Sequence, residues 1–331
     1  NLSRFPLFFP EKREFFLERI GFTRFGQQEM AELFYSRRIG LSPDGEPVPI
    51  LGGARLTGNV GRTEVGVLAI RQRESAGLPE TDFYVARVRH PLGARSSFGA
   101  IFTDREGGRA GEEWSRSAGF DLDVKPTERL GLTFFWATTR DPRKNADTDA
   151  WRFSGLWDDG LWQLYTSAKR YDEGFDPGIG FVERAGILNL YGRGMRRFLP
   201  RAGLVRQWSV SAEHDYFEDL AGAPVGRRTE LGLAAEGRDG SALEAELLDL
   251  TWDRLDEPFE IRPGIVVPAG AFWNRGHSLE VGTSPAATLS ASAGVEWGSF
   301  YGGRRETWSG QLTYRPNAHL LVDLTEDYND V

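Results

Sequence analysis

The sequence TLSASAGVEWGS, residues 288–299, alternates strictly between two kinds of side chain. One set is apolar and ends in an aromatic ring, while the other holds serine, glycine and glutamate. Successive side chains of a β-strand point to opposite faces of the sheet, so this period of two predicts a strand with one apolar and one polar face. Residues 306–314 and 319–327 repeat the pattern. Together the three stretches predict an antiparallel module of long strands.

The length of these strands separates two classes of β protein. Strands of soluble domains usually have about five or six residues, whereas a tilted strand that crosses a bilayer needs about nine to eleven. The module matches the second class, and the same alternation recurs upstream as far as residue 51. The predicted strands are 51–58, 62–71, 81–90, 95–104, 114–124, 130–140, 149–157, 161–171, 185–197, 204–215, 227–237, 241–252, 275–283, 288–299, 304–314 and 318–328.

The connections between these strands alternate between short and long. Short ones, such as 59–61 and 238–240, contain turn-forming residues, whereas longer ones include 172–184, 216–226, 253–274 and 300–303. Bacterial outer-membrane barrels have short periplasmic turns and long extracellular loops. The sequence therefore predicts an all-β fold, an antiparallel transmembrane β-barrel of about 16–18 long strands.

The chain of 331 residues has no linker-like change in composition, but its first part is irregular. Residues 1–50, here called the lead segment, are rich in aromatic residues and arginine, and only residues 32–39 within them have a strand-like pattern. We expect the lead segment to pack on or inside the barrel as a plug. Residues 51–331 are the expected barrel, and because the last strand ends on the loop side, the barrel is expected to be incomplete at its C-terminus.

Composition limits the partners. The chain has 40 Lys and Arg against 48 Asp and Glu, and its net charge of -8 argues against a nucleic acid. The absence of cysteine excludes disulfides and thiolate metal sites. Since no apolar run approaches the roughly twenty residues of a spanning helix, only strands are predicted to cross a membrane.

Several motifs resemble an uncharacterised family of bacterial outer-membrane β-barrels. They are RFPLFFPEKREFFLE at 4–18, LFYSRRIG at 33–40, PILGGARLTG at 49–58, GFDPGIGFVER at 174–184 and IRPGIVVPAGAFW at 261–273. In that family, such a region follows an N-terminal domain similar to family-nine carbohydrate-binding modules, and these 331 residues do not include that domain. The resemblance implies the bacterial outer membrane. Some members are labelled hydrolases, but the family has no established activity, so no catalytic residue is transferred.

Acidic residues recur on the predicted inward faces. Burying so many carboxylates in a dry core would cost much free energy, so they require water, arginine partners or both. A charge-paired lumen that a plug fills and an open channel both satisfy this requirement. The lumen-lining candidates are Asp121, Asp123, Glu213, Glu230, Glu236, Glu244, Glu246, Glu280, Glu296, Asp323, Arg87 and Arg89, and the plug candidates are Arg37 and Arg38. On this basis Asp121→Asn is expected to cost little, and Phe120→Arg on the lipid face much.

Three functions fit these patterns. The first is a pore or a barrel that binds and translocates a hydrophilic solute, with the lipid bilayer as its surroundings. The alternatives are an envelope hydrolase with a Ser-His site at His214 or His277, and a structural or docking subunit that binds a partner envelope protein. We predict no cofactor and no metal site, and leave open whether the chain is an enzyme.

Overall fold

The computed structural model describes residues 6–27, 30–42, 45–75, 77–107, 113–143, 148–262 and 264–330. Sixteen long strands form one sheet, and their order in the sheet follows their order along the chain. The small strands β11, β16 and β17 lie between long strands in the sequence but do not belong to this sheet. The predicted all-β antiparallel class and the predicted strand number are thereby confirmed. The strands are β3 Ile50–Val60, β4 Thr63–Gln72, β5 Thr81–Leu92, β6 Ser96–Gly107, β7 Glu113–Val124, β8 Leu130–Arg140, β9 Asp149–Asp158, β10 Trp162–Tyr171, β12 Ile187–Phe198, β13 Val205–Asp219, β14 Pro224–Gly237, β15 Ala242–Leu255, β18 Gly270–Gly282, β19 Leu289–Phe300, β20 Gly303–Asn317 and β21 Leu320–Asp330.

The chain divides into two compact units. The N-terminal unit contains residues 2–155 and 168–188, and the C-terminal unit contains residues 156–167 and 189–331. Each has one edge strand: among the described residues β3 pairs with β4 alone, and β21 pairs with β20 alone. The predicted division at residue 50 does not separate these units, and it stays a prediction.

The two faces of the N-terminal unit differ in burial. On one face the side chains are almost fully buried, as at Leu68 and Val85, which are 2% and 1% exposed. On the other face large apolar side chains stay open, as at Phe98 and Phe102, which are 42% and 45% exposed. This separation reflects the period of two in the sequence, and the buried face is the one predicted to point inward.

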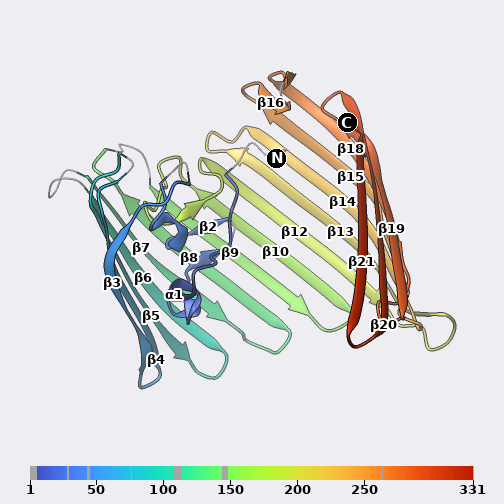
Figure 1. The fold of residues 1–331 in the computed structure, drawn as a ribbon, viewed down its shortest axis with the longest axis horizontal. Helices are drawn as coiled ribbons and strands as arrows, with labels where there is room; N and C mark the ends of the chain where they lie inside the picture. The colour runs from blue at the N-terminus through green and yellow to red at the C-terminus, as the bar shows by residue number, and fades with distance from the viewer. Residues whose placement is uncertain are drawn as a thin grey trace. The chain divides into compact units, whose positions relative to one another are not determined.

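The lead segment covers this buried face (Figure 1, blue). It contains only short elements: α1 Glu14–Leu17, η1 Ile20–Phe22, β1 Gly26–Gln27, β2 Ala31–Glu32 and η2 Ser36–Arg38. Phe25 packs against Phe135 of β8 with ring centroids 5.6 Å apart. Two glycines let the segment come close: a Cβ at Gly66 of β4 would collide with the Phe22 carbonyl, and one at Gly119 of β7 would lie 2.7 Å from the Phe25 ring.

A long connection packs beside the lead segment. Residues 172–186 join β10 to β12 and include β11, Phe181–Val182, which pairs antiparallel with β2 in a small sheet with β1. The Tyr35 amide donates to the Ile179 carbonyl at 2.8 Å, and the Glu183 amide donates to the Met30 carbonyl at 2.9 Å. This connection also contacts the sheet, since the Asp176 amide donates to the Thr139 hydroxyl of β8 at 3.3 Å. The lead segment and the connection thus lie side by side on the sheet face.

The strand-like pattern of residues 32–39 does not form a strand, apart from Glu32. Leu33 and Phe34 are consecutive and both buried, so buried and exposed side chains do not alternate there. The chain then bends into η2, where the Arg13 guanidinium donates to the carbonyls of Ser36, at 2.9 Å, and Ile39, at 2.7 Å. These side-chain bonds satisfy carbonyls that a strand would pair with a neighbouring strand.

The predicted alternation of connections holds only in part. The connections 73–80, 141–148, 172–186 and 256–269 are long, as predicted, and the last contains a small hairpin of β16 Phe259–Arg262 and β17 Ile265–Val267. Two connections predicted to be longer are instead tight turns, at 220–223 and 301–302. At the first of these turns the strands extend further than the alternation in the sequence suggested, since β13 continues to Asp219 and β14 begins at Pro224.

Candidate functional site

An acidic groove lies on the inward face of the C-terminal unit, along strands β12 to β19. Its volume is about 550 Å³. Small side chains on neighbouring strands, such as Ser209, Ser211 and Gly232, leave room for it. Six of the predicted lumen residues line the groove: Glu213, Glu230, Glu244, Glu246, Glu280 and Glu296.

Strand register brings several of these acids directly opposite one another. Glu213 of β13 is the cross-strand partner of Glu230 of β14, and Glu244 of β15 is the partner of Glu280 of β18. Like charges placed directly opposite destabilise a sheet. Each pair therefore needs arginine partners, water or a mobile cation to offset the repulsion.

Arginines neutralise only part of the groove. The Arg228 guanidinium bridges Glu230 at 2.5 Å and Asp249 at 2.9 Å. Arg193 lies 3.8 Å from Glu213, and Arg305 pairs with Glu296. Across the described part of the chain, Glu244, Glu246 and Glu280 form no ion pair. The uncompensated negative charge is therefore concentrated on β15 and β18.

Asp249 is an inward acid that the sequence alternation did not reveal. A strict alternation from Glu244 and Glu246 assigns odd-numbered residues of this strand to the lipid face. The register shifts between Leu231 and Gly232 in the pairing of β14 with β15, and between Glu246 and Asp249 in the pairing of β15 with β18. Such a bulge inserts one residue and reverses the alternation beyond it. Asp249 then faces Arg228 on β14.

The candidates in the N-terminal unit form a different arrangement. Arg87 of β5 is 6% exposed and pairs with Asp121 of β7 at 2.5 Å, across the intervening strand β6. Gly99 of β6 makes this contact possible, since a Cβ there would lie within 2.7 Å of the Arg87 and Asp121 side chains. The Arg87 guanidinium also lies over the Phe25 ring of the lead segment, at 5.3 Å. This pair fastens the covered face instead of lining a groove.

The remaining candidates lie apart. Arg89 donates to Ser97 at 3.0 Å, and with Asp123 it lines a second hollow near the turn end of β5 to β7. Glu236 pairs with Arg206 near a turn of the C-terminal unit. Asp323 accepts from the Thr313 hydroxyl at 2.6 Å on the edge strand β21.

Two histidines considered for a hydrolytic site lie on the opposite face from the acids. His214 follows the inward Glu213, and its Nδ1 lies 2.8 Å from the Thr229 hydroxyl. His277 precedes Ser278, which lines the groove, and its ring lies against Trp297 at 5.6 Å. Its Nδ1 lies 2.9 Å from the Leu247 carbonyl. The arrangement does not assemble the predicted Ser-His site from the described residues.

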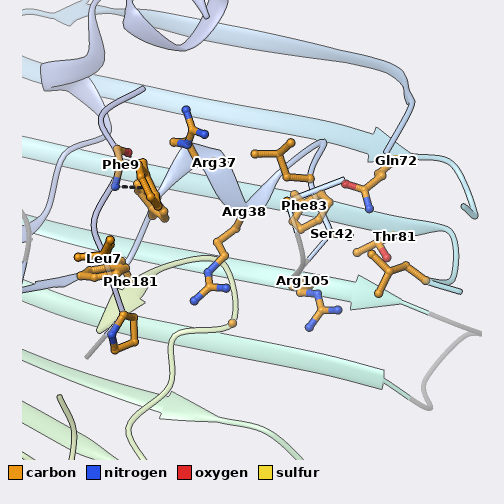
Figure 2. Close-up of a pocket in the computed structure, with 16 residues that line it drawn as sticks. Leu7, Phe9, Arg37, Arg38, Ser42, Gln72, Thr81, Phe83, Arg105 and Phe181 are labelled. Carbon is orange, nitrogen blue, oxygen red and sulfur yellow. Dashed lines mark hydrogen bonds between the residues drawn. The ribbon is translucent and has the colours of Figure 1, made fainter. Parts of the chain in front are cut away.

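The plug candidates Arg37 and Arg38 line a separate pocket of about 470 Å³ in the N-terminal unit (Figure 2). Arg37 lies over the Phe9 ring at 5.7 Å, and Arg38 Nε donates to the Gly180 carbonyl at 3.1 Å. Both belong to the covering layer of the sheet. Within the described ranges, no group of three histidine, aspartate or glutamate residues could hold a metal ion.

None of the described helices is long and apolar enough to cross a membrane. No family model and no curated protein matches the sequence. A solved structure with a similar fold is OccAB3 of Acinetobacter baumannii, with a TM-score of 0.41 and 8% sequence identity over 81% of this chain and 87% of that chain. A likeness of this size carries no functional argument, so a function for this chain has to be inferred from its own geometry.

Proposed function

We propose that this protein is a transmembrane β-barrel of the bacterial outer membrane that binds and passes a small hydrophilic solute, with a preference for cations. The acidic groove is the observation that carries the proposal. Its uncompensated acids Glu244, Glu246 and Glu280 lie together on two neighbouring strands. A ring of carboxylates in a narrow aqueous path concentrates cations and repels anions.

The exposed apolar face supports the membrane as the surroundings. Outward side chains of both units remain open although they are large, among them Phe98, Phe120, Leu279 and Trp308. Aromatic rings contact one another along this face, as Phe98 and Phe120 do at 6.2 Å. Soluble monomers rarely expose continuous apolar surfaces of this kind. Contact with lipid hydrocarbon removes the free-energy cost of exposing this surface to water, and the strand lengths suit a bilayer.

The proposed test is a reversal potential measured across a planar bilayer under a KCl gradient. We expect a cation preference that weakens as salt rises, because the Debye length falls to about 3 Å at 1 M. The double variant Glu244→Gln/Glu246→Gln should lower the preference. Glu74→Gln is the control, since this exposed loop residue forms no ion pair within the described chain.

Two results would contradict the proposal. An anion preference would show that arginines, and not the carboxylates of the groove, determine the electrostatic potential along the solute path. An absence of conductance in the wild-type protein would favour the structural or docking subunit, in which the lead segment fills the interior. The hydrolase alternative receives no support from His214 and His277, which lie on the face away from the groove.

A further inference from the structure

The pocket shown in Figure 2 is built from three separate parts of the N-terminal unit. Its walls come from the lead segment, from the loop ends of strands β4 to β6 and from the connection that contains β11. The volume of about 470 Å³ is within the range of small-molecule sites. The proposed function makes no use of this pocket.

The charged residues that line the pocket are all cationic. Arg37, Arg38 and Arg105 all line it, and no acidic side chain of the described residues does. In Figure 2 the Arg38 and Arg105 guanidiniums extend toward the same side of the pocket, while Arg37 extends the other way. Two cations near one small cavity repel each other, so an anion between them would be stabilised.

The guanidiniums of Arg38 and Arg105 have N–H donors that form no hydrogen bond within the described residues. Arg38 uses its Nε to hold the Gly180 carbonyl. Within the described part of the chain, the two terminal nitrogens of Arg38 have no partner, and the Arg105 side chain forms neither a hydrogen bond nor an ion pair. Arg37 differs, because its Nη1 reaches the Pro10 carbonyl at 3.4 Å within the lead segment. A guanidinium presents a planar fork of donors that matches a carboxylate.

The uncharged lining combines the polar residues Ser42, Gln72 and Thr81 with aromatic and apolar side chains. Phe83 and Phe181, each 3% exposed, are almost fully buried, and Leu7 and Phe9 at the rim are 47% and 54% exposed. Exposed apolar side chains at the mouth of a pocket gain free energy when a ligand covers them. The pocket therefore combines two guanidiniums that have unused donors with an aromatic surface.

We propose that this pocket binds a small organic carboxylate with an aromatic body. The carboxylate accepts hydrogen bonds from Arg38 and Arg105, and the ring packs against Phe9 and Phe181. The ligand would connect the lead segment, which carries Arg38, to strand β6, which carries Arg105. Binding would therefore also stabilise the docked position of the lead segment, because a ligand that binds only the docked form shifts the equilibrium toward it.

The first experiment uses the wild-type protein in detergent with 4-fluorobenzoate as the probe, followed by ¹⁹F NMR. We expect saturable binding with a Kd on the order of 1 mM or tighter. The uncharged 4-fluorobenzamide should bind at least about tenfold more weakly, because it lacks the charge that the arginines recognise. Acetate, which lacks the ring, should compete poorly with the probe.

The variant Arg38→Gln/Arg105→Gln should weaken fluorobenzoate binding by at least about tenfold. Arg129→Gln, an exposed turn residue of the same unit, is the matched control and should bind like the wild type. In the wild type, a probe concentration of ten times Kd should slow tryptic cleavage of the lead segment by about tenfold, if cleavage requires undocking.

Equal binding of the acid and the amide by the wild type would overturn the proposal, even if the double variant failed to fold. Unchanged affinity in a folded double variant would also overturn it. Since none of these measurements depends on conductance, the carboxylate site and the proposed pore can fail independently.

Discussion

A single glycine determines how Arg87 is neutralised. Arg87 and Asp121 lie on strands β5 and β7, and they meet over Gly99 of β6, where a larger residue would block the contact. The guanidinium is 6% exposed and the Asp121 side chain 22% exposed, so little water is available to replace the partner. The expectation from sequence that Asp121→Asn is nearly neutral is therefore revised.

We expect Asp121→Asn to destabilise the protein by about 3 kcal/mol, because it leaves a buried cation without its counter-charge. Chemical unfolding in phospholipid vesicles measures this change. The double variant Arg87→Met/Asp121→Leu should recover most of the loss, since it removes both charges together. A single variant as stable as the wild type would show that water reaches Arg87.

Glu11 fastens the lead segment through a pH-dependent contact. Its carboxylate accepts from the Arg13 Nη2 and from the Ser36 hydroxyl, each at 2.6 Å. Burial raises the pKa of Glu11, but these hydrogen bonds and the charge of Arg13 outweigh it and hold the pKa at about 2, below the ordinary 4.5. The ionised form is thus favoured in the docked segment.

The stabilisation from Glu11 should be complete above pH 4.5 and should be lost as the pH falls toward about 2. Pepsin cleavage within the lead segment at pH 4 and at pH 2 tests this expectation. We expect faster cleavage at the lower pH, after correction for the activity of pepsin on an unfolded substrate. The Glu11→Gln variant should be cleaved faster at pH 4 and should show a smaller change between the two pH values.

At the scale of elements, backbone contact holds the lead segment against the sheet. Gly66 of β4 allows the Phe22 carbonyl to approach so closely that even a methyl group would collide with it. Gly119 of β7 accommodates the Phe25 ring in the same way. Two glycines on separate strands thus define where the segment can lie.

Gly66→Ala should displace the turn at η1 and expose the lead segment. We expect the rate of tryptic cleavage after Arg19 or Arg24 to rise by about tenfold, which corresponds to a loss of about 1.4 kcal/mol in docking free energy. Gly58→Ala on the neighbouring strand β3 is the matched control, because its added Cβ meets no atom within 4 Å. Equal cleavage rates in the two variants would mean that the segment adjusts without undocking.

Elements with a regular period were predictable from sequence, whereas elements positioned by a distant contact were not. Strands such as β7 and β8 match their predicted ranges closely, because one exposed apolar face and one inward face impose the period of two on every residue. The prediction for residues 32–39 was wrong, since their conformation depends on the Arg13 side chain. Asp249 was missed because a bulge leaves no signal in the alternation before it. Both errors came from interactions with residues that are distant in sequence.

At the scale of the whole molecule, the two units use their inward faces differently. The N-terminal unit covers its face with the lead segment and neutralises Arg87 with Asp121. The described residues of the C-terminal unit leave a groove on that face, lined by acids that include the unpaired Glu244 and Glu246. Alternation along strands predicted which residues share a face, but only the cross-strand register showed that these acids gather in one groove.

The apolar face of the whole sheet leads to a further prediction. Phe120 is 37% exposed and contacts Phe98 and Trp136 on that face. Phe120→Arg should destabilise the protein in lipid vesicles by about 2–4 kcal/mol, because a charged side chain near the bilayer midplane loses its hydration. Phe120→Leu, which keeps the apolar contact, is the control. Similar stabilities for the two variants would argue against lipid on this face.

The contacts between the lead segment and the connection that contains β11 should form late in folding. Most neighbouring strands of the sheet are joined by short connections and can pair locally, but Arg38 meets Gly180 across 142 positions of sequence. Contacts between such distant residues form late, because a long loop must close first. The lead segment is therefore the first of these parts to be made and, we expect, among the last to reach its place.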